Sequence, residues 1–114
     1  MSYDEWFDDQ PDHWRPMADA VIDHLVDLGD VAIDPVDVGL LVKKRRTFVE
    51  LRPVRADLRL SMIHSHEIRD PRITRRQRLS GSRWVHFVDL AGVDDIDDQI
   101  LGWLTESHLD SPDA

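Results

Sequence analysis

The chain has 114 residues, of which 41% are hydrophobic and 32% are charged, a composition typical of one globular domain. It contains no cysteine, which excludes disulfides, thiolate nucleophiles and cysteine-built zinc sites. Its apolar runs are too short to cross a membrane, and the acidic start lacks the features of a signal peptide. We therefore expect a cytoplasmic protein that does not interact with membranes.

The net charge of −9 combines three blocks of alternating sign. Residues 1–41 hold eleven acidic side chains and one arginine, and residues 42–83 hold four acidic side chains against thirteen lysines and arginines. Residues 84–114 hold eight acidic side chains and no lysine or arginine. This acidic protein therefore has a basic patch in its middle block that could attract an anionic partner. Alternatively, the acidic and basic blocks neutralise each other within the fold.

In chain order, a flexible acidic segment is predicted over residues 1–10, a single domain over residues 11–109 and a tail over residues 110–114. The domain begins with apolar residues that recur at steps of three and four, which predicts an amphipathic helix. These residues are Trp14, Met17, Val21, Leu25 and Leu28. Pro16 is tolerated only in a first helical turn, and Gly29 is a typical stop, so the helix is predicted to run from about residue 15 to residue 28.

After this helix the periodicity changes to two, which is the repeat of a half-buried strand. Strand-like stretches are VAID, VGLLVKK, TFVELRPV, ADLRLSMIHS, ITRRQRLS and RWVHFVDL. The alternation in the fourth stretch places Leu58, Leu60, Met62 and His64 on one face. Residues 54–57 are short enough to form a hairpin turn between the third and fourth stretches.

A second helix closes the chain. Asp94 is the predicted N-cap, and acidic residues follow it in the first turn, where they face the positive end of the helix dipole. The buried stripe is predicted to contain Ile96, Ile100, Trp103 and Leu104. Since an antiparallel sheet needs a cover on one face, we expect an α+β fold. Its sheet would be an antiparallel β-meander of about five strands, with the N-terminal and C-terminal helices packed on one face.

A histidine pair suggests a metal site as one possibility. His64 and His66 are two residues apart, with Glu67 and Asp70 close behind, and such side chains bind zinc, nickel or iron(II). The Glu and His spacing that completes a jelly-roll site is absent, however. We therefore predict no metal and no cofactor, with His64 and His66 as weak candidates only.

Glu50 is the one carboxylate that stands out, because it lies in a strand between Arg46 and Arg52. An exposed ion pair explains this setting, whereas a catalytic acid or base would need burial to tune its pKa. The chain has no glycine-rich phosphate loop, Gly-x-Ser-x-Gly elbow or Walker motif. We expect no enzymatic activity, and a hydrolase-like enzyme that uses Glu50 or the histidines remains an alternative.

The middle block favours a binding function, because its strands carry many arginines and arginine makes bidentate contacts with phosphates and carboxylates. The predicted binding residues are Arg46, Glu50, Arg52, Arg76, Trp84 and His86. The preferred interpretation is a module that binds a protein partner, or a second copy in a dimer, through the Arg-rich face of its sheet. The alternative is a nucleic-acid or nucleotide-binding accessory module in which Trp84 stacks on a base.

An ordered set of short motifs resembles a known family over residues 21–108. The motifs are VDLGD, RRTFVELRP with Phe48 and Glu50, LRLSM, DPR at 70–72, SRWVHFVDL with Trp84 and His86, and DDIDDQILGWLTESH. They resemble the domain of unknown function DUF5655. The resemblance implies a small α+β domain that is sometimes joined to nuclease-like domains, and it transfers no catalytic residues. IHSHEIRDPR stands where relatives have a variable loop, so it implies no role for His64 or His66.

Overall fold

The structure, a computed structural model, describes residues 1–111; residues 112–114 of the predicted tail lie outside the described residues. The helices are α1 (Tyr3–Trp6), α2 (Trp14–Leu28) and α3 (Asp98–Asp110), with a short 3-10 turn at Val93–Asp95. The strands are β1 (Ala32–Val36), β2 (Gly39–Lys43), β3 (Thr47–Val54), β4 (Asp57–His64), β5 (Arg75–Ser80) and β6 (Arg83–Leu90). No helix in this part of the chain is long and apolar enough to span a membrane.

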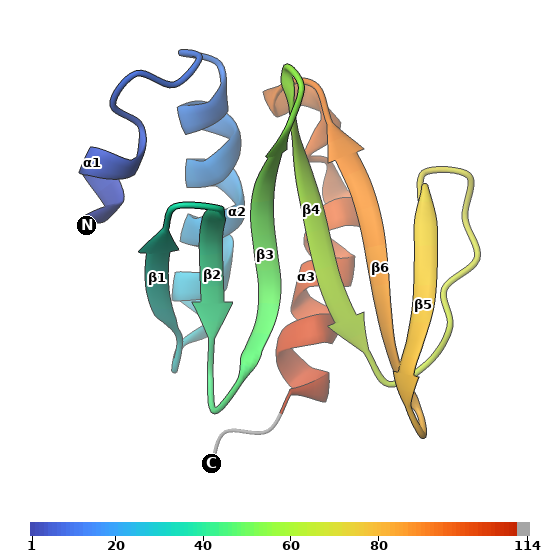
Figure 1. Cartoon of the computed structure of the whole chain (residues 1–114). Coiled ribbons are helices and arrows are strands. Elements are labelled where there is room, and N and C mark those ends of the chain that lie inside the picture. The colour runs from blue at the N-terminus through green and yellow to red at the C-terminus, as the bar shows by residue number, and fades with distance from the viewer. Residues whose placement is uncertain (112–114) are drawn as a thin grey trace.

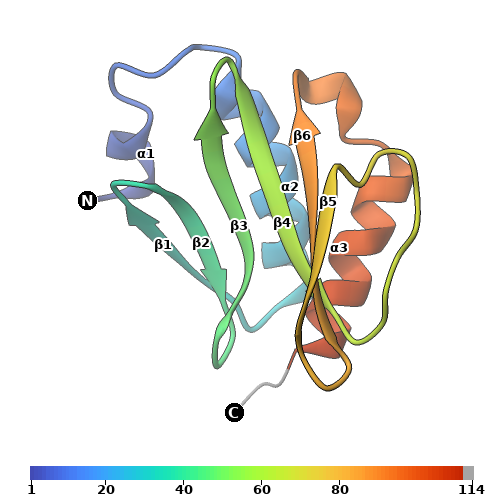
Figure 2. The ribbon, with the colours of Figure 1, turned by 45° about the vertical axis from the view of Figure 1, so that its right-hand side comes forward.

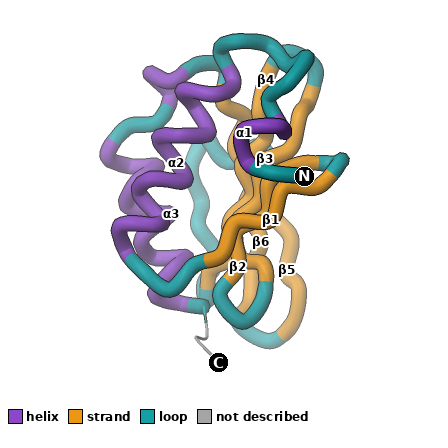
Figure 3. Tube along the Cα trace, turned by 90° about the vertical axis from the view of Figure 1, so that its left-hand side faces the viewer, coloured by secondary structure: helices purple, strands orange, loops and turns teal. Residues whose placement is uncertain are grey.

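The elements form two layers, which confirms the predicted α+β fold. One layer is a six-stranded antiparallel sheet. The other contains α2 and α3, which pack against each other on a single face of the sheet (Figures 1 and 3). Within residues 1–111 no helix packs on the opposite face, which we call the outer face.

The sheet differs from the predicted five-stranded meander in strand number and order. It has six strands, in the order β1-β2-β3-β4-β6-β5. The chain leaves β4, forms β5 at the edge, and returns to place β6 beside β4. The meander therefore holds only as far as β4, because the buried side chains of β6 pair with those of β4.

Alternation along β4 decides which side chains enter the core. Leu58, Leu60, Met62 and His64 are fully buried beneath the helices, as their shared face predicted. Arg55, with φ of 58°, occupies the two-residue turn that leads from β3 to β4. This turn confirms the predicted hairpin and sets the register between the two strands.

The two long helices each pack one side against the core. The buried residues of α2 are Trp14, Met17, Ala18, Val21, Ile22 and Leu25, and α3 buries Ile100, Trp103, Leu104, Ser107 and His108. The helix α2 ends where Gly29 adopts φ of 92°, a conformation that glycine adopts without strain. The predicted extent of this helix is therefore correct within one residue.

The start of α3 was predicted three residues too early. Asp94 lies in the 3-10 turn, and the N-cap is Asp97, whose side chain accepts a hydrogen bond from the Ile100 N–H. Arg72 Nη1 donates a hydrogen bond to Asp97 Oδ1 at 2.8 Å. Several aspartates in a row offer equivalent caps in the sequence, and the contact with Arg72 distinguishes the one that is used.

The N-terminal residues, predicted as a flexible acidic segment, pack against the body in the structure. Residues 3–6 form one helical turn, capped by Ser2, and the Trp6 side chain is buried. Its Nε1–H donates to the Val36 carbonyl oxygen at 2.9 Å, and its ring lies 6.3 Å from the Trp14 ring. Burial of one large aromatic side chain with a satisfied N–H explains why this acidic segment is ordered.

Gly39 provides a test of the packing between β2 and β3. A Cβ atom at this position would overlap the Leu51 carbonyl oxygen of the neighbouring strand. We predict that Gly39→Ala lowers the free energy of unfolding by about 1–3 kcal/mol, as overpacking does. Urea unfolding measures the change.

Gly102→Ala is the matched control. The added Cβ atom meets nothing within 4 Å, and alanine favours the helical conformation of α3, so stability should rise by about 0.5–1 kcal/mol. Equal destabilisation by both substitutions would contradict the assignment of a close backbone approach at Gly39.

Candidate functional site

The outer face is the side of the sheet that no helix of residues 1–111 covers (Figure 3). The register aligns one row of side chains across all six strands, namely Asp34, Leu41, Glu50, Ser61, Phe87 and Arg75. Alternation directs these side chains away from the buried residues that lie between them on each strand. The row therefore crosses the middle of the outer face.

Most charges on the outer face form ion pairs. Arg52 Nε lies 2.8 Å from Glu50 Oε2, and Lys43 Nζ lies 2.9 Å from Asp34 Oδ2. Arg59 contacts both carboxylate oxygens of Asp89, at 2.7 and 3.2 Å. These pairs are partly exposed and so contribute little to stability. Their effect is to neutralise part of the basic block locally.

Arg75 differs from these residues, because its guanidinium lies over the Phe87 ring, 5.8 Å from the ring centroid. The arrangement is a cation–π contact at the β5 side of the face. It leaves the charge of Arg75 without an acidic partner among the described residues. Arg75 is thus available to an external carboxylate.

Apolar side chains occupy the centre of the outer face. Ile63, Val85 and Phe87 are half-buried there, and Leu79 is 45% exposed. Two hollows of about 210 and 370 Å³ lie on this surface and share Glu50, Ser61 and Phe87 in their linings. The outer face therefore combines an apolar centre with a charged border.

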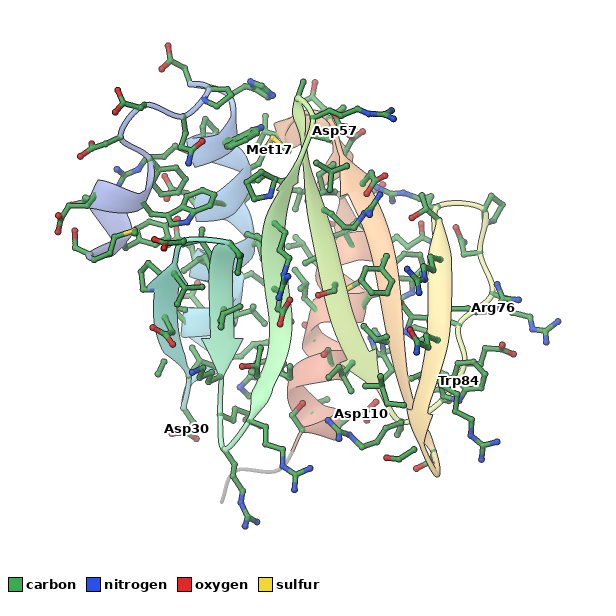
Figure 4. All side chains as sticks on the ribbon, viewed as in Figure 1. Met17, Asp30, Asp57, Arg76, Trp84 and Asp110 are labelled. Atoms are coloured by element: carbon green, nitrogen blue, oxygen red, sulfur yellow. The ribbon has the colours of Figure 1, made fainter. Side chains whose placement is uncertain are left out.

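The six predicted binding residues do not form one site. Glu50 and Arg52 lie on the outer face, whereas Arg76, Trp84 and His86 lie on the helix side of β5 and β6. Figure 4 labels Arg76 and Trp84 on these two strands. Arg46 belongs to the turn between β2 and β3.

Strand parity explains the separation and shows what was missed. The pairing of His86 with Met62, and of Phe87 with Ser61, assigns the even positions of β6 to the core. Phe87 and Arg75 therefore lie on the outer face, Phe87 near its apolar centre and Arg75 on the edge strand β5, although the sequence-based set did not include them. The pattern that could have found them is the alternation of β6 read against that of β4.

Arg76 has a local partner instead of an exposed position on the outer face. Its Nε atom lies 2.9 Å from Glu67 Oε2, and Arg69 Nε lies 2.8 Å from Glu67 Oε1. The hydrogen bonds from Arg69 and Arg76 lower the pKa of Glu67. These contacts fasten the loop after β4 to the helix side of β5.

The helix side also contains a buried histidine pair. His64 and His86 are fully buried, and their Nδ1 atoms lie 3.0 Å apart. His64 Nε2 lies 2.8 Å from the Trp103 carbonyl oxygen, and His86 Nε2 lies 2.8 Å from the Ile68 backbone nitrogen. All four ring nitrogens are therefore hydrogen-bonded within the protein.

These contacts determine the proton positions. The Trp103 carbonyl can only accept, so His64 Nε2 carries hydrogen; the Ile68 N–H can only donate, so His86 Nε2 does not. It follows that the His86 Nδ1–H donates to His64 Nδ1. A further proton on either neutral ring would oppose an existing donor, which makes the pair a site for two neutral imidazoles.

The pKa values agree with this arrangement. Burial lowers the pKa of His86 to about 4, and electrostatic repulsion of a charged His86 ring by its neighbours His64, His66 and Arg76 acts in the same direction. Burial also lowers the pKa of His64, although the hydrogen bond to Trp103 opposes this change. The chief cause in both rings is the loss of water around the charged form.

A metal site at His64 and His66 finds no geometric support. Both nitrogens of His64 are engaged, while the His66 side chain is exposed and lies 3.8 Å from Glu106. Within residues 1–111, no group of three or more His, Asp or Glu side chains is placed to hold a metal ion. The pair formed by His64 is instead part of the core.

Comparison with known proteins identifies the family of this chain. This two-layer α+β domain with one uncovered sheet face matches a family described as a domain of unknown function (DUF5655) over residues 3–111. The chain belongs to this family, and the match covers nearly all of its length. Comparisons with curated proteins and with solved structures found no match.

The histidine pair predicts a specific pH dependence. The unfolded chain binds protons near the ordinary histidine pKa of about 6.5, whereas the folded chain binds them only at lower pH. The free energy of unfolding should therefore fall as the pH is lowered from 6.5 towards about 4. The slope should approach about 1.4 kcal/mol per pH unit for each histidine that stays neutral.

Urea unfolding between pH 5 and pH 7.5 measures this slope. His86→Gln should reduce it whatever its effect on absolute stability, because one of the two titrating groups is removed. His66→Gln is the control, because it removes an exposed histidine that is not part of the hydrogen-bonded pair, and it should change the slope less than His86→Gln does. An unchanged slope in His86→Gln would contradict the assignment of a neutral pair.

Proposed function

We propose that this domain is a non-enzymatic binding module that holds another protein on its outer face. The observation that carries the proposal is the apolar centre around Phe87 on a sheet face that no helix covers. Apolar patches bordered by polar residues are typical of protein-binding surfaces. Aromatic and arginine side chains, as at Phe87 and Arg75, commonly dominate such interfaces.

The charge on the outer face favours an acidic partner. By strand parity the face carries five basic side chains, Lys43, Arg52, Arg59, Arg75 and Arg83, and four acidic side chains, Asp34, Glu50, Asp57 and Asp89. Three of the acidic side chains, Asp34, Glu50 and Asp89, are already paired with arginine or lysine. An approaching protein therefore meets a net positive border, which steers an acidic surface towards the apolar centre.

A second copy of the chain fits this surface less well. If two outer faces met, their excess arginines would oppose each other. If instead the outer face of one copy met the acidic helix side of another, each copy would keep a free complementary surface, and a ring or an open chain of molecules would result instead of a simple dimer. A different protein with an acidic surface satisfies the charge without either difficulty.

The geometry also bears on the enzymatic and nucleic-acid alternatives. Glu50 forms a partly exposed ion pair with Arg52 on the outer face, and within residues 1–111 no buried acid–base partner accompanies it. A nucleic acid requires a continuous basic surface along its phosphates, but Arg52 and Arg76 lie on opposite faces of the sheet. These observations favour a protein partner over a substrate or a nucleic acid.

The test compares Phe87→Glu with Val26→Glu. The first substitution places a charge in the apolar centre, and the second places the same charge at a 51% exposed position of α2. Proteins captured by the wild-type domain from its natural cells are identified, purified and titrated against each variant. We expect Phe87→Glu to weaken binding by about tenfold or more, and Val26→Glu to leave it unchanged.

Melting curves first establish that both variants are folded. The proposal fails if no captured protein distinguishes the two variants. It also fails if short single-stranded or double-stranded oligonucleotides bind at low salt and Phe87→Glu abolishes that binding, because the outer face would then serve a nucleic acid.

A further inference from the structure

The two edges of the sheet are treated differently. At the β1 edge, Pro35 has no backbone N–H to offer, and the Val36 carbonyl oxygen accepts a hydrogen bond from Trp6. The helix α1 packs against the same strand (Figure 1). Backbone groups and space at this edge are therefore already used, so another strand cannot easily pair there.

The β5 edge lacks such a cover. All six residues of β5 are exposed, and within residues 1–111 the only strand paired with β5 is β6. The loop over residues 65–74 does not close the edge, because it runs beside α3 on the helix side of the sheet (Figure 2). An edge strand of this kind presents free backbone donors and acceptors.

The β5 edge is positively charged. The sequence of β5 contains Arg75, Arg76 and Arg78. Arg76 is paired with Glu67, whereas Arg78 donates to the Gly81 carbonyl oxygen, and Arg75 lies over Phe87. Two of the three arginines thus keep charges that no described acidic side chain neutralises. Charge repulsion disfavours pairing with a second β5 strand.

We propose that the β5 edge receives an extended acidic segment of a partner protein as a seventh strand. Acidic side chains on both faces of the added strand would lie opposite arginines, since Arg75 points to the outer face and Arg78 to the helix side. The added backbone would supply both donors and acceptors to the edge, which is how strands are added in peptide recognition.

A peptide suits this edge better than a nucleic acid. An edge strand offers alternating N–H and C=O groups, and the phosphates of a nucleic acid can only accept hydrogen bonds. The carbonyl groups of β5 would then stay unpaired. The proposal concerns the edge and not the outer face, so it can succeed or fail independently of the proposed function.

The probe is an eight-residue peptide that alternates glutamate and valine, titrated into the full chain labelled with ¹⁵N. We expect its largest chemical-shift changes at the amides of Arg75–Ser80 and slower hydrogen exchange there by about tenfold or more. A peptide with lysine in place of glutamate should bind at least about tenfold more weakly, since like charges would face each other.

Backbone pairing is tested with two N-methylated forms of the acidic peptide. Methylation of alternate amides blocks one side of an extended strand, so one set should abolish binding and the other set should leave it intact. Unchanged binding by both forms would overturn the proposal, since attraction would then be purely electrostatic. Binding of a single-stranded oligonucleotide at the same amides with equal affinity would overturn it as well.

Substitution in the protein gives a further comparison. The double substitution Arg75→Glu with Arg78→Glu should weaken binding of the acidic peptide by about tenfold or more and should strengthen binding of the lysine peptide. Arg55→Glu, in the turn between β3 and β4, is the control and should change neither. The peptide comparisons on the unmodified chain remain decisive if the double variant does not fold.

Discussion

The burial of one face of the sheet beneath α2 and α3 is the constraint on which the rest of the structure depends. Because strand side chains alternate, paired residues of neighbouring strands point to the same face of the sheet. The residues of β3 and β6 that pair with Leu60 and Met62 therefore also enter the core. The residues between them on each strand point to the outer face. The same parity that builds a continuous core therefore builds the outer face, with Phe87 at its centre and charged pairs around it. Core and candidate binding surface are two consequences of one register.

Polar contacts then define how α3 sits on that core. The Trp103 carbonyl oxygen accepts from His64, and Ser107 Oγ donates to the Ile63 carbonyl oxygen at 2.6 Å. At the end of the helix, Lys44 Nζ donates to the His108 carbonyl oxygen at 2.7 Å. Apolar packing tolerates small shifts of a helix, whereas hydrogen bonds at several positions along it do not. Among the described residues, no buried side-chain nitrogen or oxygen lacks a hydrogen-bond partner, which is the condition under which buried polar groups favour one arrangement.

Sequence periodicity predicted the two long helices, the strand alternation and the α+β class, since each of these depends on local spacing. The strand order after β4 was not predictable in this way, because the choice between β5 and β6 as neighbour of β4 depends on which strand has apolar side chains to bury. The burial of His86 follows from that choice. The docking of Trp6 and the use of Asp97 as N-cap likewise depend on Val36 and Arg72, which are distant in the chain. The predicted binding residues were separated for the same reason, because the relative parity of two strands is a tertiary property.

The position of β5 also bears on how chains with this architecture can change in length. The chain leaves the central sheet after His64 and re-enters it at β6, so β5 and the turn that follows it, residues 75–82, extend a five-stranded body that is already continuous through the pairing of β4 with β6. The residues before β5 are tied to the core and to α3, because Ile68 contacts His86, Arg72 contacts Asp97 and Ile73 is buried. Insertions or deletions within residues 75–82 would therefore alter mainly an edge. Evolution can therefore lengthen, shorten or recharge this segment while the architecture of the family is retained.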